Sequence, residues 1–318
     1  MRRMKKAQSR QDITIREAFE QFQIHNQVNN LAKDTIRYYA QKSEYFFAFI
    51  GDIDVSVTSI TPEVIESYIL DMKKQGNLSD ATINNRLRMV RAFLYYCMER
   101  EQMPRYSIKL VRASTKQKEP YTQEELKCLL KRPNTDTCSF AEYRNWVMVN
   151  FLLATGCRAS TLIELQIKDI DLPAGMVFFR HMKARNQIIV PLSQSMAKIL
   201  QEYLTYREGE NEAPLFISET GARLTLSTLE NAIYSYNRRR GVDKTSIHLF
   251  RHTYAKLYIQ AGGDPFRLQK LLGHSDLTMT RHYVALYADD LKANYDKLNP
   301  LEQFKRQTQD GDRHKMKK

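Results

Sequence analysis

The sequence predicts a mainly α-helical protein of two domains, with a small antiparallel β-sheet in the second domain, which makes it an α+β fold. Its 318 residues are enough for two domains that each bury a core. Hydrophobic residues make up 42% of the chain, and glycines and prolines are few, a composition typical of a globular, helix-rich protein. A single strand-like patch lies in the second half, among stretches whose apolar residues recur at helical spacing.

Four segments of the first hundred residues have helical patterns with recognisable ends. Thr14 precedes the first pattern, "IREAFEQFQIHNQ", and Gly51 follows the second, "KDTIRYYAQKSEYFFAFI". The third has Thr61 as its cap, Pro62 at its first helical position and Gly76 at its end. The fourth is "SDATINNRLRMVRAFLYYCMER". We therefore expect a small helical bundle.

A polar, basic segment, "VRASTKQKEP", follows the four helices and has the composition of a linker between domains. Thr122 caps the next helix, and Glu125 completes a capping box. The last residues, "RQTQDGDRHKMKK", lack a hydrophobic pattern. The expected order is a basic tail, the helical bundle, a linker, a second domain and a basic tail, at residues 1–11, 12–111, 112–120, 121–298 and 299–318.

The second domain opens with helices, among them the apolar "NWVMVNFLLATG". Its strand-like patch consists of "GMVFFRHM", the turn "KARN" and "QIIVPL", which predicts a β-hairpin. Helices follow to the end of the domain. Lys183 falls in the hairpin turn, where a lysine is either idle in solvent or able to reach a groove as a general acid.

The charge of the chain favours polyanionic partners. It has 49 lysines and arginines against 36 aspartates and glutamates, a formal net charge of +13, although many basic proteins bind no nucleic acid. No run of eighteen apolar residues is present to span a membrane, and the basic start of the chain lacks the apolar stretch of a secretory signal. We expect a cytoplasmic protein without a membrane partner.

The fourth predicted helix places polar residues on one side, namely Asn84, Arg86, Arg88 and Arg91. A polar helix side is usually a solvated face. If the second domain acts on DNA, this side becomes a candidate for contacts with phosphates.

The cysteines indicate neither a disulfide framework nor a zinc site. Cys97, Cys128, Cys138 and Cys157 lack the paired spacing of metal ligands, and we expect buried free thiols. No phosphate-binding loop and no cluster of acidic metal ligands is visible in the sequence. The sequence thus indicates no metal and no cofactor.

Three short stretches of the second domain carry side chains suited to binding an anion. "TGCR" ends an apolar helix and puts Arg158 beyond the break, where its planar fork either faces solvent or binds two phosphate oxygens. In "HLFRH", His248 and Arg251 are three residues apart and share one helical face. "LLGHSDLTMTRHYVALY" places His274 after a glycine that ends a helix, and Tyr283 nine residues later. Each stretch alone is also compatible with ordinary packing or solvent exposure.

In their order along the chain, "TGCR", "KARNQIIVPL", "HLFRH" and "LLGHSDLTMTRHY" resemble the tyrosine recombinase (phage integrase) family, in particular its two-domain Xer and Cre types. The resemblance covers the whole second domain, which would be the catalytic domain. The first domain looks like the family's core-binding domain, which clamps the DNA duplex. The resemblance implies a site-specific DNA recombinase or integrase that cleaves and rejoins strands through a 3′-phosphotyrosyl intermediate, without ATP or metal.

The resemblance also implies a role for each matching residue. Arg158 and Arg251 would bind the scissile phosphate, and His274 would hydrogen-bond the same group. The remaining roles are those of general acid, general base and nucleophile, which would fall to Lys183, His248 and Tyr283.

Two departures leave details open. The family often has an acidic residue three positions after the first arginine, where this chain has Thr161, although Glu164 lies one helical turn later. Tyr287, one turn beyond Tyr283, is a rival nucleophile. The spacing from His274 favours Tyr283, and Tyr287 falls on an apolar stripe that packs on its own domain or docks on a neighbouring protomer.

The resemblance implies double-stranded DNA target sites, a homo-tetramer on paired sites and an association with the nucleoid, and it leaves room for an accessory directionality factor. The helical bundle begins close to the start of the chain, which suggests a simple two-domain integrase, resolvase or transposon-type recombinase, or a chromosome-dimer resolvase. Of these we expect integration, excision or resolution of a mobile element. Two alternatives remain at this point: a type IB topoisomerase-like enzyme that relaxes DNA, and a non-catalytic DNA-binding accessory protein of the same fold.

Overall fold

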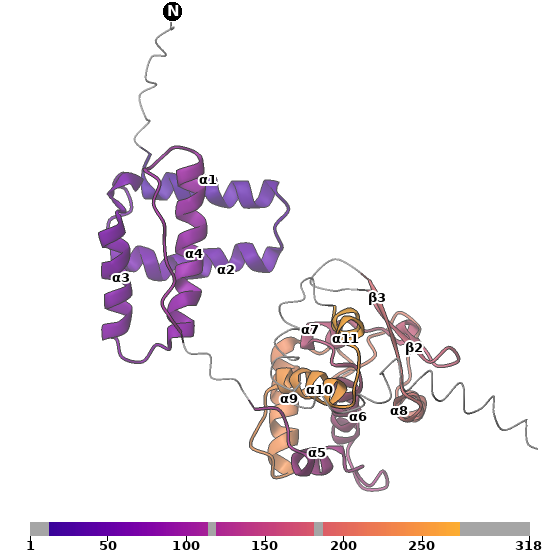
Figure 1. The fold of residues 1–318 in the computed structure, drawn as a ribbon. Coiled ribbons are helices and arrows are strands. Elements are labelled where there is room, and N and C mark those ends of the chain that lie inside the picture. Colours follow the sequence, from indigo (N-terminus) through magenta and orange to yellow (C-terminus); the bar gives the residue numbers. More distant parts are fainter. Residues whose placement is uncertain (1–12, 114–118, 181–186, 274–318) are drawn as a thin grey trace, which may run out of the picture. The chain divides into compact units, whose positions relative to one another are not determined.

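The computed structural model describes residues 13–113, 119–180 and 187–273, and it divides the chain into two compact units, residues 1–117 and 118–318. Both units are mainly helical in their described parts, and the named strands lie in the second (Figure 1). The prediction of a mainly α fold with a small antiparallel sheet is confirmed.

The first unit is a helical bundle in which the fourth helix is the most buried. Its helices are α1 (Ile15–Val28), α2 (Lys33–Ile50), α3 (Pro62–Lys74) and α4 (Asp80–Glu99). Both α1 and α2 pack against α4, which buries Leu87, Val90, Phe93 and Leu94 at helical spacing (Figure 1). Aromatic rings join the helices, as where Phe22 of α1 lies 5.8 Å from Phe93 of α4, centroid to centroid.

Most helix ends fall where the sequence predicts them. Thr14 forms a capping box with Glu17 at the start of α1, and Gly51 ends α2 with a φ of +81°. Thr61 takes the N-cap position of α3 without a capping hydrogen bond from its side chain, so that Pro62 is the sequence feature that favours this start.

The second unit is organised around one helix. Its helices are α5 (Gln123–Leu130), α6 (Phe140–Thr155), α7 (Ala159–Glu164), α8 (Gln194–Tyr206), α9 (Leu226–Arg239), α10 (Ile247–Gln260) and α11 (Pro265–Leu272). Helix α6 packs against α5, α8, α9 and α10 and is buried on nearly all sides, because its apolar residues are spread around the helix. The predicted capping box of Thr122 and Glu125 at the start of α5 is confirmed.

The predicted hairpin forms two strands of a three-stranded antiparallel sheet. These are β2 (Met176–Phe179) and β3 (Ile188–Pro191), with Val177 opposite Val190. Strand β1 (Ile170–Asp171) was not predicted; it pairs with β2 and is too short to show an alternating pattern. The turn that carries Lys183 lies outside the described residues.

The cysteines only partly match expectation. Cys97 and Cys157 are buried free thiols, but Cys128 is exposed and Cys138 is partly exposed, so the prediction was wrong for these two. Cys128 lies on the side of α5 that is exposed to solvent, next to the exposed Lys127. Among the described helices, none is long and apolar enough to cross a membrane.

Candidate catalytic site

Arg158 is placed by the sharp end of α6. The helix ends at Thr155, and Gly156 follows in the left-handed conformation with a φ of +61°. The chain then turns, and Arg158 takes the N-cap position of α7. The predicted break after the apolar helix is confirmed, and it puts the arginine at the junction of two helices.

Arg251 lies on α10 and is almost fully buried, with 3% of its surface exposed. Its Nη1 donates to the main-chain oxygen of Gly156 at 2.9 Å, and its Nη2 donates to the main-chain oxygen of Leu272 at 2.9 Å. These oxygens belong to the C-terminal ends of α6 and α11, where the helix dipole is negative. The guanidinium therefore holds two helix ends together.

Arg158 approaches the same end of α11. Its Nη2 lies 3.5 Å from the main-chain oxygen of Gly273, the next carbonyl after that of Leu272. Burial lowers the pKa of Arg158, but an arginine remains cationic at neutral pH. Two guanidinium groups thus converge on consecutive carbonyls, directly before His274 in the chain.

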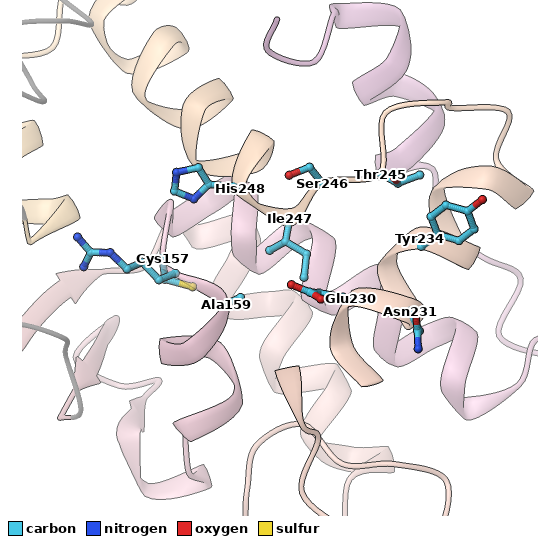
Figure 2. Close-up of a pocket in the computed structure, with 10 residues that line it drawn as sticks. Cys157, Ala159, Glu230, Asn231, Tyr234, Thr245, Ser246, Ile247 and His248 are labelled. Atoms are coloured by element: carbon cyan, nitrogen blue, oxygen red, sulfur yellow. The ribbon is translucent and has the colours of Figure 1, made fainter. Parts of the chain in front are cut away.

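His248 faces a pocket that it shares with Arg158. The pocket has a volume of about 420 Å³. His248 lies in the first turn of α10, and its exposed side chain lines one side of the pocket (Figure 2). The other side is formed by α9, with Glu230, Asn231 and Tyr234 (Figure 2). These three residues were not predicted from the sequence, because polar positions on an amphipathic helix have the same pattern as any solvated face.

The structure thus brings together Arg158 at the start of α7 with His248 and Arg251 of α10. Lys183, His274, Tyr283 and its rival Tyr287 fall outside the described residues, and their roles stay predictions. Within the described ranges, no three histidine, cysteine, aspartate or glutamate side chains gather where they could hold a metal ion.

Comparison with known proteins shows which family this chain belongs to. A model of the phage integrase family matches residues 120–289, more than half of the chain, and a model of the phage integrase SAM-like domain matches residues 14–118. The chain belongs to the phage integrase family, the tyrosine recombinases. The resemblance drawn from the sequence motifs is confirmed.

Two curated tyrosine recombinases match most of the chain. A XerC from Thermodesulfovibrio yellowstonii is 29% identical over 300 residues, which cover 88% of this chain and 97% of that protein. A XerD from Oceanobacillus iheyensis is 28% identical over 286 residues, which cover 85% of this chain and 93% of that protein.

Solved structures of other tyrosine recombinases have the same fold. The Tn1549 transposon integrase in complex with a circular intermediate DNA has a TM-score of 0.70 at 21% identity, covering 85% of this chain and 95% of that one. XerH bound to a palindromic difH substrate has a TM-score of 0.66 at 22% identity, covering 90% and 85%.

Thr161 and Glu164, the two residues considered for the family's acidic position, lie on α7 of this tyrosine recombinase. Thr161 is buried in α7, and Glu164 is turned to Arg223, whose Nη1 donates to it at 2.8 Å. Glu164 therefore does not replace the missing acid. Arg251 donates to the main-chain oxygens of Gly156 and Leu272.

The candidate DNA-contacting side of α4 needs one correction. Asn84 does not lie on the polar side: it is 6% exposed, and its side-chain amide exchanges two hydrogen bonds of 2.8 Å with the main chain of Val111. It ties the end of the first unit to α4. Arg88 is exposed and Arg86 and Arg91 are partly exposed, and their contact with DNA stays a prediction.

Replacing Gly156 with alanine should lower the free energy of unfolding of this recombinase by about 2–4 kcal/mol. A Cβ there would lie 2.6 Å from Cδ1 of Tyr254 and 2.8 Å from Cδ2 of Leu272, and φ is +61°. Gly221→Ala separates the two causes, because its φ is +82° but nothing lies within 4 Å, and it should cost only about 1 kcal/mol. Urea unfolding followed by the fluorescence of Trp146, the single tryptophan, measures both. Equal losses would show that the crowding is relieved without cost.

Proposed function

We propose that this tyrosine recombinase cleaves and rejoins duplex DNA at specific sites, with Tyr283 as its nucleophile. The observation that carries the proposal is the convergence of Arg158 and Arg251 on the carbonyls of Gly273 and Leu272. This point directly precedes the sequence stretch with His274 and Tyr283, inside the segment that matches the family. Two cations near one point suit a phosphodiester, whose negative charge grows as it is attacked.

The proposed reaction exchanges one phosphodiester for another. The phenolic oxygen of Tyr283 attacks the scissile phosphorus and gives its proton to His248. The bond from phosphorus to the 5′ oxygen breaks, and that oxygen takes a proton from Lys183. Arg158, Arg251 and His274 stabilise the charge on the phosphoryl oxygens. A free 5′-hydroxyl then attacks the phosphotyrosine and reverses these steps.

The same chemistry explains why a base and a cationic pocket are needed. An ordinary tyrosine has a pKa near ~10, so that it is protonated at neutral pH. The exposed ring of His248 beside Arg158 suits a proton acceptor that must meet the incoming hydroxyl. Because the phosphotyrosine keeps the energy of the broken bond, rejoining needs no ATP.

The partners follow from the same proposal. We expect double-stranded DNA sites bound by a homo-tetramer, in a recombinase that integrates, excises or resolves a mobile element. The fold is shared with a transposon integrase solved on a circular intermediate DNA, whereas the curated relatives are named XerC and XerD. Mapping covalently trapped DNA ends in cells would separate an element's ends from a single chromosomal site.

The proposal predicts a covalent protein–DNA adduct. The wild-type protein, incubated with a nicked duplex that carries the mapped site, should give a slower band on a denaturing gel. Cleavage next to the nick frees a short strand, and when this strand with its 5′-hydroxyl dissociates, the adduct cannot be rejoined and accumulates. Two site-bearing duplexes should also exchange strands through a junction. Binding without an adduct would indicate a non-catalytic DNA-binding protein, and DNA relaxation without exchange would indicate a topoisomerase.

A further inference from the structure

Tyr45 of α2 lies on an exposed face of the first unit with two cations on its ring. The residue is 45% exposed. The guanidinium carbon of Arg86 lies 3.8 Å from the centroid of the ring, and Nζ of Lys42 lies 5.3 Å from it. The first distance is that of direct contact between a guanidinium and an aromatic face. A ring on α2 therefore orders a side chain of α4.

The aromatic face continues along α2. Tyr38, Lys42 and Tyr45 follow one another at steps of four and three residues, so they share one side of the helix. The hydroxyl of Tyr38 donates to Asn85 of α4, 2.5 Å from its main-chain oxygen and 2.8 Å from its side-chain oxygen. Burial raises the pKa of Tyr38, and the charge of Arg88 opposes this rise.

The cations of this face are not neutralised. Lys42, Arg86 and Arg88 pair with no carboxylate in the part of the chain that the structure describes. Other surface arginines do pair, such as Arg16 with Asp54. A guanidinium stacked on a ring can still donate from the N–H groups at its edge. Arg86 also acts on the buried hydroxyl of Tyr68 of α3, because its positive charge opposes the rise that burial causes in the pKa of Tyr68. The face thus presents ordered positive charge to solvent, which suits the regularly spaced phosphates of a nucleic acid.

We propose that Tyr45 is a platform that pre-positions Arg86 for a backbone phosphate of duplex DNA, with Lys42 held beside it. The inference rests on the proposed function, for which it names a residue that positions the candidate phosphate contact Arg86. A free arginine side chain loses conformational freedom when it binds, and the ring removes part of that freedom before DNA arrives. Tyr45 is a positioning residue, because it acts through Arg86.

The test uses the full chain with Tyr283→Phe, so that binding is measured without cleavage. The probe is a fluorescein-labelled duplex of random sequence, because phosphate contacts do not depend on base sequence. Tyr45→Leu should weaken binding roughly 3- to 10-fold. Tyr45→Phe keeps the ring and should bind within about twofold of the parent. Tyr206→Leu is the matched control, because Tyr206 is 54% exposed and carries no stacked cation in the described residues, and it should leave binding unchanged.

A double-mutant cycle shows whether Tyr45 acts through Arg86. Arg86→Ala should weaken binding and reduce the slope of log Kd against log salt by about one unit. In the Arg86→Ala protein, Tyr45→Leu should then have no further effect. Additive losses would overturn the proposal, because they would mean that Tyr45 contacts DNA by itself. Unchanged binding of folded Tyr45→Leu would overturn it as well.

A second variant covers the case in which Tyr45→Leu does not fold. Arg86→Lys keeps the charge and loses the planar stack, so the proposal expects weaker binding with an unchanged salt slope. Equal binding of Arg86→Lys would overturn the platform. A parent protein that binds no duplex would overturn the proposed function together with the platform, whereas a parent that binds DNA and a Tyr45→Leu variant that binds equally well would overturn the platform alone.

Discussion

Replacing Tyr283 with phenylalanine should abolish the covalent adduct, by at least roughly 10⁴-fold in rate, and leave DNA binding within about twofold. The substitution removes one oxygen, the atom that would bond to phosphorus, and keeps the ring. The cations of the proposed set, Arg158, Arg251 and Lys183, cannot take its place, because they are not nucleophiles at neutral pH. A denaturing gel measures the adduct, and a mobility shift on the same nicked duplex measures binding.

Tyr287 supplies the matched control for this prediction. Tyr287→Phe removes the same kind of atom four residues further along the sequence, and it should retain cleavage. An adduct that persists in Tyr283→Phe and disappears in Tyr287→Phe would assign the nucleophile to Tyr287. Loss of the adduct in both variants would mean that the second hydroxyl is also needed.

The parts of the fold that sequence predicts well are those set by local chemistry. Caps such as Thr14 and Thr122, and the stops at Gly51 and Gly156, depend on residues within one turn of the helix end. The pairing of β2 and β3 was predictable for the same reason, because the two strands lie close together in the sequence. In contrast, β1 exists only because β2 is there to pair with it.

Burial that depends on distant segments was not predictable. From the sequence, Asn84 has the pattern of a surface residue of α4. In the structure, the main chain of Val111, 27 residues later, forms hydrogen bonds with both the nitrogen and the oxygen of its side-chain amide. The cations of α4 could be named from sequence, but the ring of Tyr45 beneath Arg86 could not, because it comes from another helix. Contacts between side chains of different helices cannot be read from the sequence pattern of either helix alone.

The candidate site divides in the same way. The motifs gave Arg158, His248 and Arg251, and the structure places them together although they are far apart in sequence. The acceptors of Arg251 are main-chain oxygens, which any residue type provides and which carry no sequence signal. From the sequence alone, Thr161 therefore suggested that a supporting acidic residue was missing. In the folded chain, the ends of α6 and α11 supply acceptors for the guanidinium of Arg251.

Replacing Arg158 or Arg251 with alanine should lower the cleavage rate in both cases but the free energy of unfolding in only one. Both variants should lose cleavage rate, roughly 10²–10³-fold for Arg158→Ala, because each removes preorganised donors to the phosphate. Affinity for DNA should fall only a few-fold, since one phosphate contact among several is lost. Single-turnover cleavage on the nicked duplex gives the rate, and the mobility shift gives the affinity.

Only Arg251→Ala should also lower stability, by about 2–4 kcal/mol. Its guanidinium is buried and makes two hydrogen bonds of 2.9 Å, so its removal leaves the carbonyls of Gly156 and Leu272 without this donor. Arg158 is partly exposed, and its contact with Gly273 is long at 3.5 Å, so Arg158→Ala should unfold within about 0.5 kcal/mol of wild type. Urea unfolding followed by the fluorescence of Trp146, which lies in the same unit, measures the difference. Equal stability of the two variants would mean that the helix ends of α6 and α11 hold together without Arg251, and that its buried guanidinium serves the phosphate alone.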